Sequence, residues 1–411
     1  MGSNCRTTKD RRSGMWSVAM WMSIYVAAGF PAAQAVSAES PDNNPISDYL
    51  NAIESAEAER SAYSAELSDL YLGLGKSHFS NREYEQARLA YQRGMQIERV
   101  NYGLNSLSQT PYLLSIADTE SFLGNWDESQ EALENLYQIN SQAYGENDPR
   151  MLPVLDELLD WYMNTYKERN HIGGYQNLVI SERLGNRMLR ILNRGIPGED
   201  PRAAQRYRKI GHLHYFIANH IKQYGEASES GFTITTSTAT TRSPNSTSQQ
   251  HYRRGKAALE KVVESLEQQE GVSDSQKALA IAELGDWYLV FGQRMSASKA
   301  YRLAYESLQE DVGSKQLTST LFGQPTIIEF TALESSTLEL QERPLQVSMI
   351  VSKAGVPRKM EILNPPEDIN KTEVQAIFKD IRSKRFRPKL VDGETIESSL
   401  VFPYASNQKQ G

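Results

Sequence analysis

The stretch "YLGLGKSHFSNREYEQARLAYQRG" (Tyr71–Gly94) decides the fold, because its pattern returns much later in the chain as "IAELGDWYLVFGQRMSASKAYRLA" (Ile281–Ala304). Small residues at such positions let two antiparallel helices approach closely, and large residues fill the space to the next pair. The spacing therefore predicts a helical hairpin that repeats along the chain. The shared positions are Leu74-Gly75, Ala87, Tyr91 and Gly94 in the first copy, and Leu284-Gly285, Ala297, Tyr301 and Ala304 in the second.

Looser copies lie between these two, at Leu113–Leu136, Tyr144–Met163 and Gly198–Ile217. The third and fourth open on Asp148-Pro149 and Asp200-Pro201, which are good helix starts because proline fits the first turn and aspartate accepts from its free N–H groups. The fourth copy is interrupted by a Ser/Thr-rich stretch at residues 227–250, too polar to pack. We expect a disordered surface loop there, with helix resuming at His251.

These copies resemble the tetratricopeptide repeat (TPR). Tyr102-Gly103 recurs as Tyr144-Gly145, a register longer than the common one of about 34 residues, which resembles the long-helix repeats of kinesin light chains. The resemblance implies an all-α solenoid, a superhelix of about five repeats over residues 66–312. An N-terminal segment with a capping helix is expected before it, at residues 39–65, and a linker with a strand after it, at residues 313–343.

The first helix of each repeat pair is expected to form a concave wall that binds peptides or partner helices. Each side chain on that wall has an ordinary alternative, as a solvated or packing residue. The candidates are Lys76, Phe79, Asp118, Phe122, Asp160, Met163, Arg208, His212, Tyr215 and Asp286.

The sequence pattern changes period near the C-terminus. Apolar residues alternate in Pro344–Pro366 around a turn at Lys353-Ala354-Gly355, which predicts a β-hairpin. Helical spacing follows in Asn370–Phe386, with Asn370 as a cap, and a last strand follows Asp392-Gly393. The order strand, strand, helix, strand predicts a small α+β domain at residues 344–405, with a tail at residues 406–411.

This module resembles the C-terminal domain of TonB, the periplasmic energy transducer, in its hairpin Ala354-Gly355-Val356, in "RFRP" (Arg385–Pro388) and in the closing "VFPY". The resemblance implies docking of an outer-membrane receptor segment by addition to a sheet edge. Lys and Arg outnumber Asp and Glu in the module, so it can instead dock onto the acidic repeats or an acidic partner. The expected binding residues are Arg382, Lys384, Arg385, Arg387, Lys389, Ser398, Leu400, Phe402 and Tyr404.

The N-terminus has basic residues before an apolar run, Ser17–Phe30, and small residues after it. This is typical of a cleavable secretory signal peptide, here residues 1–38, and favours a periplasmic protein. The alternative is an uncleaved anchor in the inner membrane facing the periplasm, in a divergent energy transducer for TonB-dependent transport. The run has no ionisable residue and no proline-rich spacer follows, both departures from TonB.

Composition narrows the function further. The single cysteine, Cys5, precedes the apolar run, so disulfides and cysteine metal sites are excluded in the exported chain, and a net charge of −7 argues against general nucleic-acid binding. No catalytic motif is present, and His212 and His214 lie on different sides of a helix. We expect no enzyme, no cofactor, no metal and no small-molecule substrate. The sequence predicts a scaffold whose repeats bind one protein while the module docks another.

Overall fold

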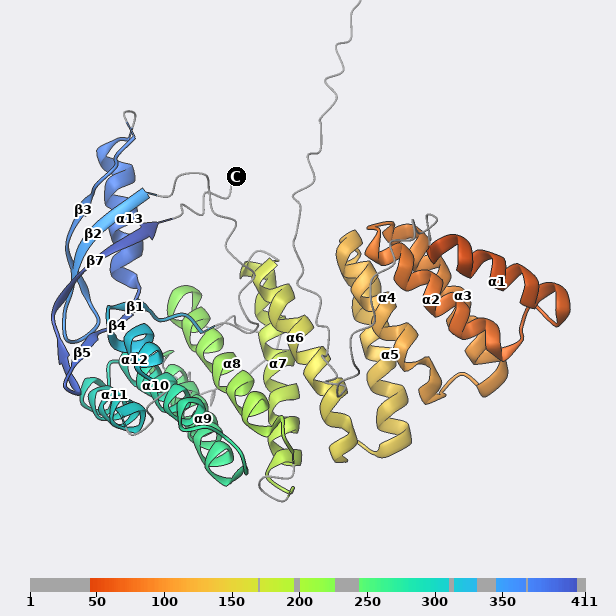
Figure 1. The fold of residues 1–411 in the computed structure, drawn as a ribbon, viewed down its shortest axis with the longest axis horizontal. Coiled ribbons are helices and arrows are strands. Elements are labelled where there is room, and N and C mark those ends of the chain that lie inside the picture. The colour runs from red at the N-terminus through yellow and green to blue at the C-terminus, as the bar shows by residue number, and fades with distance from the viewer. Residues whose placement is uncertain are drawn as a thin grey trace, which may run out of the picture.

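The computed structural model describes residues 45–168, 171–195, 200–225, 244–309, 314–330, 345–366 and 369–404. The expected signal peptide, the tail at 406–411 and residues 227–243 of the Ser/Thr-rich stretch lie outside these ranges. Helices follow one another along the long axis of the molecule, and a small module with strands lies at the C-terminal end (Figure 1).

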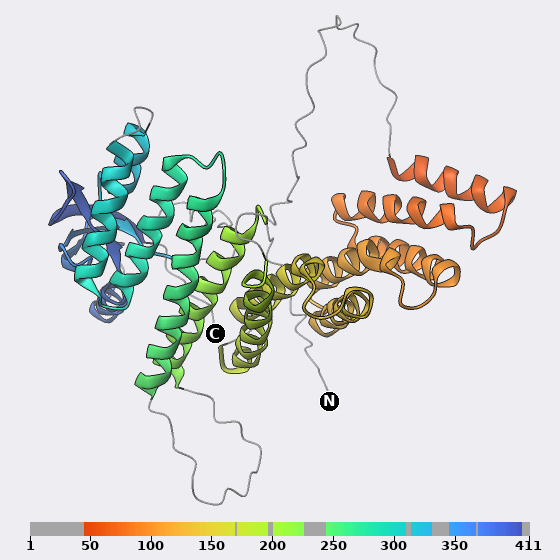
Figure 2. The same cartoon turned by 90° about the horizontal axis from the view of Figure 1, so that it is seen from below.

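The helices form antiparallel pairs that stack side by side, as the view from below makes plain (Figure 2). The five pairs in the described residues are α2 with α3, α4 with α5, α6 with α7, α8 with α9, and α10 with α11. The helix bounds are α1 Pro45–Glu59, α2 Ala65–Ser80, α3 Tyr84–Tyr102, α4 Thr110–Leu123, α5 Trp126–Tyr144, α6 Leu152–Glu168, α7 His171–Leu192, α8 Ala203–Tyr224, α9 Pro244–Gln268, α10 Asp274–Val290, α11 Arg294–Gln309 and α12 Lys315–Phe322.

Close packing within each pair follows the small residues of the repeat. A Cβ atom at Gly75 would lie 2.4 Å from the ring of Tyr91, and one at Gly285 would lie 2.5 Å from the ring of Tyr301. Tyr91 and Tyr301 are both buried, so each ring fills the space that its glycine leaves. The role predicted for the small residues is confirmed at both ends of the array.

Two segments differ from the sequence prediction. Helix α9 begins at Pro244, so the last part of the expected loop at 227–250 is helical. The linker with a strand that was expected at 313–343 contains strand β1 (Thr326–Ile327) and, in addition, helix α12, which packs on α11. Leu321 and Phe322 of α12 are buried in the core of the last helix pair, and this packing stabilises the helix.

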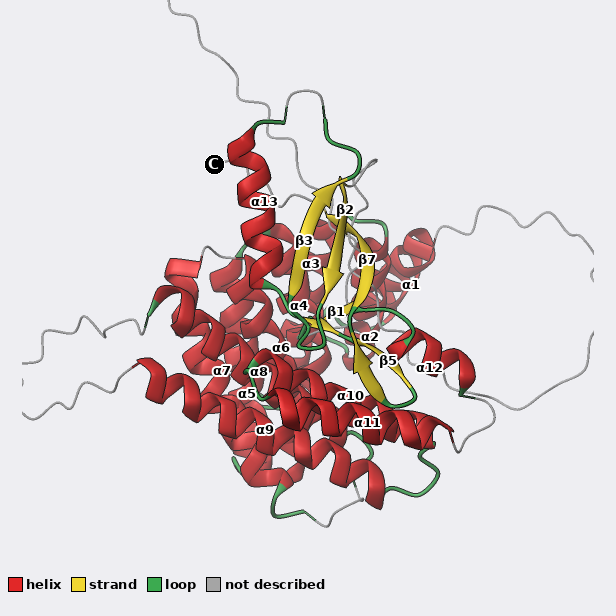
Figure 3. Cartoon of the chain, turned by 90° about the vertical axis from the view of Figure 1, so that its left-hand side faces the viewer, coloured by secondary structure: helices red, strands yellow, loops and turns green. Residues whose placement is uncertain are grey.

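The C-terminal module has the predicted order of strand, strand, helix and strand. Strand β2 (Leu345–Val351) lies between β3 (Pro357–Ile362) and β7 (Ser398–Tyr404), antiparallel to both. Helix α13 (Lys371–Ser383) packs on one face of this sheet (Figure 3). Short strands form two further two-stranded sheets: β4 (Phe386–Arg387) pairs with β1, and β5 (Lys389–Val391) pairs with β6 (Glu394–Ile396).

The core of the module lies between the sheet and α13. Val347, Met349 and Val351 alternate along β2 and are buried against Ile377 and Ile381 of the helix. Asn370 caps α13 as predicted, since its side chain accepts from the backbone N–H of Glu373 at 2.9 Å. Across the described ranges of the chain, no helix combines the length and the apolar character needed to cross a membrane.

Candidate functional site

Charged side chains link the first helices of three successive pairs, α6, α8 and α10, along the surface that was predicted to form the wall. Lys209 of α8 donates to Asp160 of α6 at 2.7 Å. Arg208, also on α8, donates to Glu283 of α10 at 2.7 Å. The predicted wall residues Asp160 and Arg208 therefore already have partners within the chain, Lys209 and Glu283, which the sequence analysis did not single out.

The wall ends at an ion pair with the C-terminal module. Arg387 of β4 donates to Asp286 of α10 from Nε at 3.0 Å and from Nη2 at 2.5 Å, and the Tyr301 hydroxyl donates to the same carboxylate at 2.8 Å. Only 13% of the Arg387 side chain and 8% of the Asp286 side chain are exposed. Both were expected on open binding surfaces, and the structure instead places them against each other.

Burial and mutual attraction act in opposite directions on the charges of this pair. Burial raises the pKa of Asp286 above its usual value, and Arg387 and the Tyr301 hydroxyl oppose that rise. Burial also disfavours the charge of Arg387, but attraction and hydrogen bonds to Asp286 outweigh it, so the pKa of Arg387 is raised. Because the guanidinium keeps its proton, the contact is a buried, bidentate ion pair.

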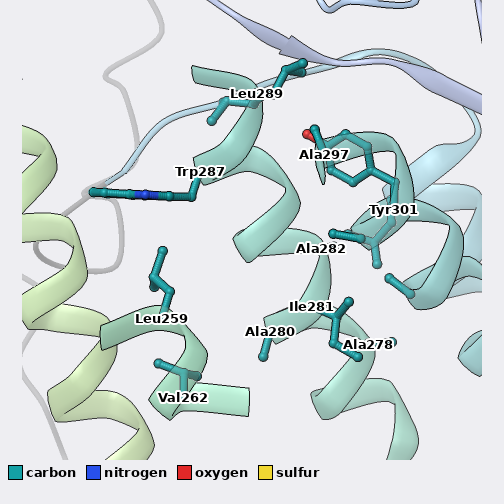
Figure 4. Packing of buried hydrophobic residues seen from close by; sticks show 14 of the residues in the cluster. Leu259, Val262, Ala278, Ala280, Ile281, Ala282, Trp287, Leu289, Ala297 and Tyr301 are labelled. Carbon is teal, nitrogen blue, oxygen red and sulfur yellow. The ribbon is translucent and has the colours of Figure 1, made fainter. Parts of the chain in front are cut away.

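Apolar contacts surround the ion pair. Trp287, Leu289 and Tyr301 lie in one cluster with the helices that precede them (Figure 4). Phe330, in the chain that leaves α12, packs its ring 5.6 Å from that of Trp287. Leu390 of β5 belongs to the same cluster. The module and the last helix pair therefore share one hydrophobic core.

The segment with Phe330 also covers part of the expected wall. The ring of Phe330 lies 5.2 Å from that of His212 and 4.9 Å from that of Tyr215. Nε2 of His212 is 2.6 Å from a carboxylate oxygen of Glu283. At this end of the array, the residues predicted to bind a partner contact the chain itself.

The N-terminal end of the wall is different. Phe79 and Phe122 pack against each other and against Tyr84, with ring centroids 5.0 to 5.3 Å apart. Lys76 and Asp118 are exposed. Met163 was expected on the wall, but it is 1% exposed in the core between α6 and its neighbours, because its side chain is on the apolar side of the helix.

Asp118 lies in a negatively charged part of the wall. Surrounding protein atoms reduce the hydration of Asp118, and the Glu157 carboxylate repels its charge. Both effects raise the pKa of Asp118, to about 7. Within the described ranges no ion pair involves either carboxylate. Asp118 is nevertheless solvent-exposed, so water screens part of this repulsion. This region has a surplus of negative charge that a cation would neutralise.

The basic cluster of the module divides into two groups. Arg382 is exposed, Lys384 pairs with Asp380 at 3.6 Å, and Arg385 donates to two nearby backbone carbonyls. Lys389 is half-buried. Arg387 is the member that docks the module, while the others remain at the surface.

Strand β7 is an edge of the three-stranded sheet. Within the described residues it pairs along its whole length with β2 and with no other strand of that sheet. Leu400, Phe402 and Tyr404 lie against the module core, and Ser398 is half-buried. The exposed side of β7 therefore offers its main chain, with Val401 pointing outward and 51% exposed. Proline is tolerated at position 403 because an edge strand can lack a donor.

Sequence reasoning missed the residues that join the two parts. Arg302 of α11 forms an ion pair with Glu394 of β6, and strand β1 adds to β4. The basic character of the module on an acidic chain was the available signal, and it pointed to docking without identifying the residues. The pairing of Arg387 with Asp286 joins positions 101 residues apart, which no local pattern encodes.

The fold and this wall define a helical-repeat protein with a docked α+β module. No family model matches the chain, and no curated protein matches it. Two crystal structures are similar in part, one of them of a variant, and both are described as a Podosopora anserina kinesin light chain with nearly identical TPR-like repeats. They are each 16% identical to this chain, cover 59% and 60% of it and 96% and 99% of their own length, and give TM-scores of 0.39 and 0.40. TM-scores this low do not assign a fold, so the class of the protein is defined by the helix pairs of this chain.

Proposed function

We propose that this chain is a non-enzymatic protein–protein interaction scaffold with two docking surfaces. One is the N-terminal part of the wall, around Asp118. The other is the free edge of β7, which takes a segment of a second protein by strand addition. The observation that carries the proposal is that β7 is an unshared edge, on a module fixed to the array through Arg387 and Asp286.

The β7 edge suits strand addition better than the other edge of the sheet. Its register with β2 continues without a break over seven residue pairs, from Leu345 with Tyr404 to Val351 with Ser398. The opposite edge, β3, is irregular, with a register shift in its pairing with β2 and a positive φ of 49° at Lys359. Added strands need a straight row of main-chain donors and acceptors, which β7 supplies as far as Phe402, since Pro403 has no N–H to donate.

The wall surface favours a partner segment with a lysine or arginine. Asp118 and Glu157 bring negative charge to α4 and α6, and the basic residues of α8 are held by Asp160 and Glu283. A cation placed beside Asp118 would lower the pKa of that carboxylate and gain attraction. The aromatic pair of Phe79 and Phe122 next to it adds apolar area for the same segment.

Site-specific crosslinking tests both surfaces in cells. A photoreactive residue at position 401 should crosslink one partner, and one at position 118 should crosslink another. The controls are positions 363 and 89, where exposed leucines lie off both surfaces with 53% and 60% of their area exposed. Equal crosslinking at test and control positions would contradict the proposal.

We place the scaffold in the periplasm. The signal-like N-terminus would direct it there, and the TonB-like module would bind an outer-membrane receptor at the β7 edge. N-terminal sequencing of the protein from fractionated cells tests this location. A chain that begins near residue 39 in the periplasmic fraction agrees with it. An intact Met1 in the inner membrane would instead support the energy-transducer alternative.

A further inference from the structure

Three successive helices bring potential metal ligands together away from the docking surfaces. Glu182 lies on α7, His214 on α8 and His251 on α9, and one ligand atom from each lies within 4.8 Å of the other two. The Nδ1 atoms of the two histidines are 3.0 Å apart. The Nδ1 atom of His251 is 4.0 Å from Oε1 of Glu182.

These distances are close to those of a tetrahedral metal centre. Ligand atoms bound to Zn²⁺ at about 2.0–2.1 Å lie about 3.3 Å from one another. The two histidine nitrogens already have nearly this separation. The carboxylate of Glu182 needs to move by about 0.7 Å toward His251 and by at most about 1.5 Å toward His214, and its side chain is 25% exposed and at the protein surface.

The chemical state of the histidines suits a cation. Both are buried, with 1% of His214 and 5% of His251 exposed. A neutral imidazole has a nitrogen lone pair to donate to a metal ion, and two such nitrogens with one carboxylate are a known zinc ligand set.

We propose that Glu182, His214 and His251 bind a divalent transition-metal ion of the zinc class. The bound ion would tie α7 to the pair of α8 and α9. Helices α8 and α9 are separated in sequence by residues 225–243, and a cross-link between the ends of a long connection stabilises the folded chain by restricting the unfolded one. The ion would thus stabilise the centre of the array, independently of either docking surface.

Arg254 sets the affinity of this site. Its guanidinium lies 2.5 Å from Oε1 of Glu182, and the Arg254 side chain is 42% exposed. A metal ion must share that carboxylate with Arg254 and is repelled by its charge. Removing the guanidinium should therefore tighten metal binding, an effect that a purely structural histidine pair would not produce.

The test uses the exported chain without a polyhistidine tag, stripped with a chelator and titrated with Co²⁺. We expect a visible absorption band that saturates at one Co²⁺ per chain and disappears on addition of Zn²⁺. Zn²⁺ should also raise the thermal unfolding midpoint. Glu182→Gln and His251→Ala should lose the band, and Arg254→Gln should bind Co²⁺ several-fold more tightly.

His220→Ala is the matched control, because His220 is also a buried histidine of α8 but bonds to Tyr166 instead. It should keep the Co²⁺ band. Glu182→Gln leaves both buried histidines in place, so it reports on binding even where His251→Ala fails to fold. Absence of a Co²⁺ band and of a Zn²⁺ shift in the wild-type chain would overturn the proposal, as would a band that survives Glu182→Gln unchanged.

Discussion

Arg387 and Asp286 form a bidentate ion pair, at 3.0 and 2.5 Å, that joins strand β4 of the module to helix α10 of the repeat array. The Tyr301 hydroxyl shares the carboxylate, so three parts of the chain meet at one buried charge. A buried ion pair is costly to break, because the partner that remains is left without compensation. The orientation of the module on the array therefore depends on two side chains.

Arg387→Met should destabilise the protein by about 3–5 kcal/mol, because the Asp286 carboxyl would stay buried without its partner. Urea unfolding measures the loss, and amide exchange should speed up in β4 and β5. The double variant Arg387→Met with Asp286→Leu should recover most of the stability, apart from about 1 kcal/mol for the hydroxyl of Tyr301. Arg385→Met is the control, since Arg385 donates only to nearby carbonyls. A loss in the double variant as large as in the single one would contradict this account.

Gly355→Ala should disturb both the packing inside the module and its contact with the array. Gly355 has a φ of +66°, and a Cβ there would lie 2.2 Å from the carbonyl oxygen of Phe386 and 2.7 Å from Leu289. Backbone strain and overpacking together should cost about 3 kcal/mol or more. Gly103→Ala isolates the strain, because Gly103 has a φ of +91° with open space around it, and should cost about 1–2 kcal/mol. Equal losses in the two variants would show that the contacts of Gly355 with Phe386 and Leu289 do not matter.

Gly285→Ala tests the packing of the helix pairs. Its Cβ would lie 2.5 Å from the Tyr301 ring, so we expect a loss of about 1–3 kcal/mol in thermal or urea unfolding. Gly185→Ala serves as the comparison, because the nearest atom to its Cβ would be a flexible end of Leu213 at 3.2 Å. It should range from neutral to about 1 kcal/mol stabilising, through helix propensity. Stabilisation by Gly285→Ala would disprove the close-approach argument.

Asp118→Asn should change how stability depends on pH. The folded pKa of about 7 is above the ordinary 3.8, so the folded state favours the protonated carboxyl. That contribution is complete below pH 3.8 and is lost as pH rises through about 7. The asparagine variant should match the wild type near pH 4 and unfold at a higher urea concentration near pH 7.5. The gain will be small because Asp118 is exposed, and Glu134→Gln, away from this surface, should give none.

The repeat array was predictable because the residues that specify each helix pair lie close together in the sequence. Gly75 with Tyr91 and Gly285 with Tyr301 recur at fixed spacing, and the structure packs each pair as that spacing requires. The order of elements in the module followed in the same way from the alternation along β2 and the helical spacing of α13. Periodicity records which side of an element is buried, and so it identifies elements well.

Contacts between distant parts could not be predicted in this way. From the local sequence, Asp286 and Arg387 are expected to be ordinary exposed charges. They are buried only because the module docks on the array. His214 was compared with its neighbours on the same helix, whereas its partner His251 lies beyond the Ser/Thr-rich stretch. One sequence contains no record of such pairings, since each residue of the pair is compatible with many surroundings.

The shared core around Trp287, Phe330 and Leu390 limits how the module and the array can be exchanged with those of other proteins. Moving the module onto another repeat array would strip Leu390 and Phe330 of their neighbours, and truncating the array before β1 would leave the end of α10 and α12 uncovered. An acceptor array would need an aspartate and a tyrosine in the places of Asp286 and Tyr301. The junction is therefore the least exchangeable part of the molecule, although two architectures meet there.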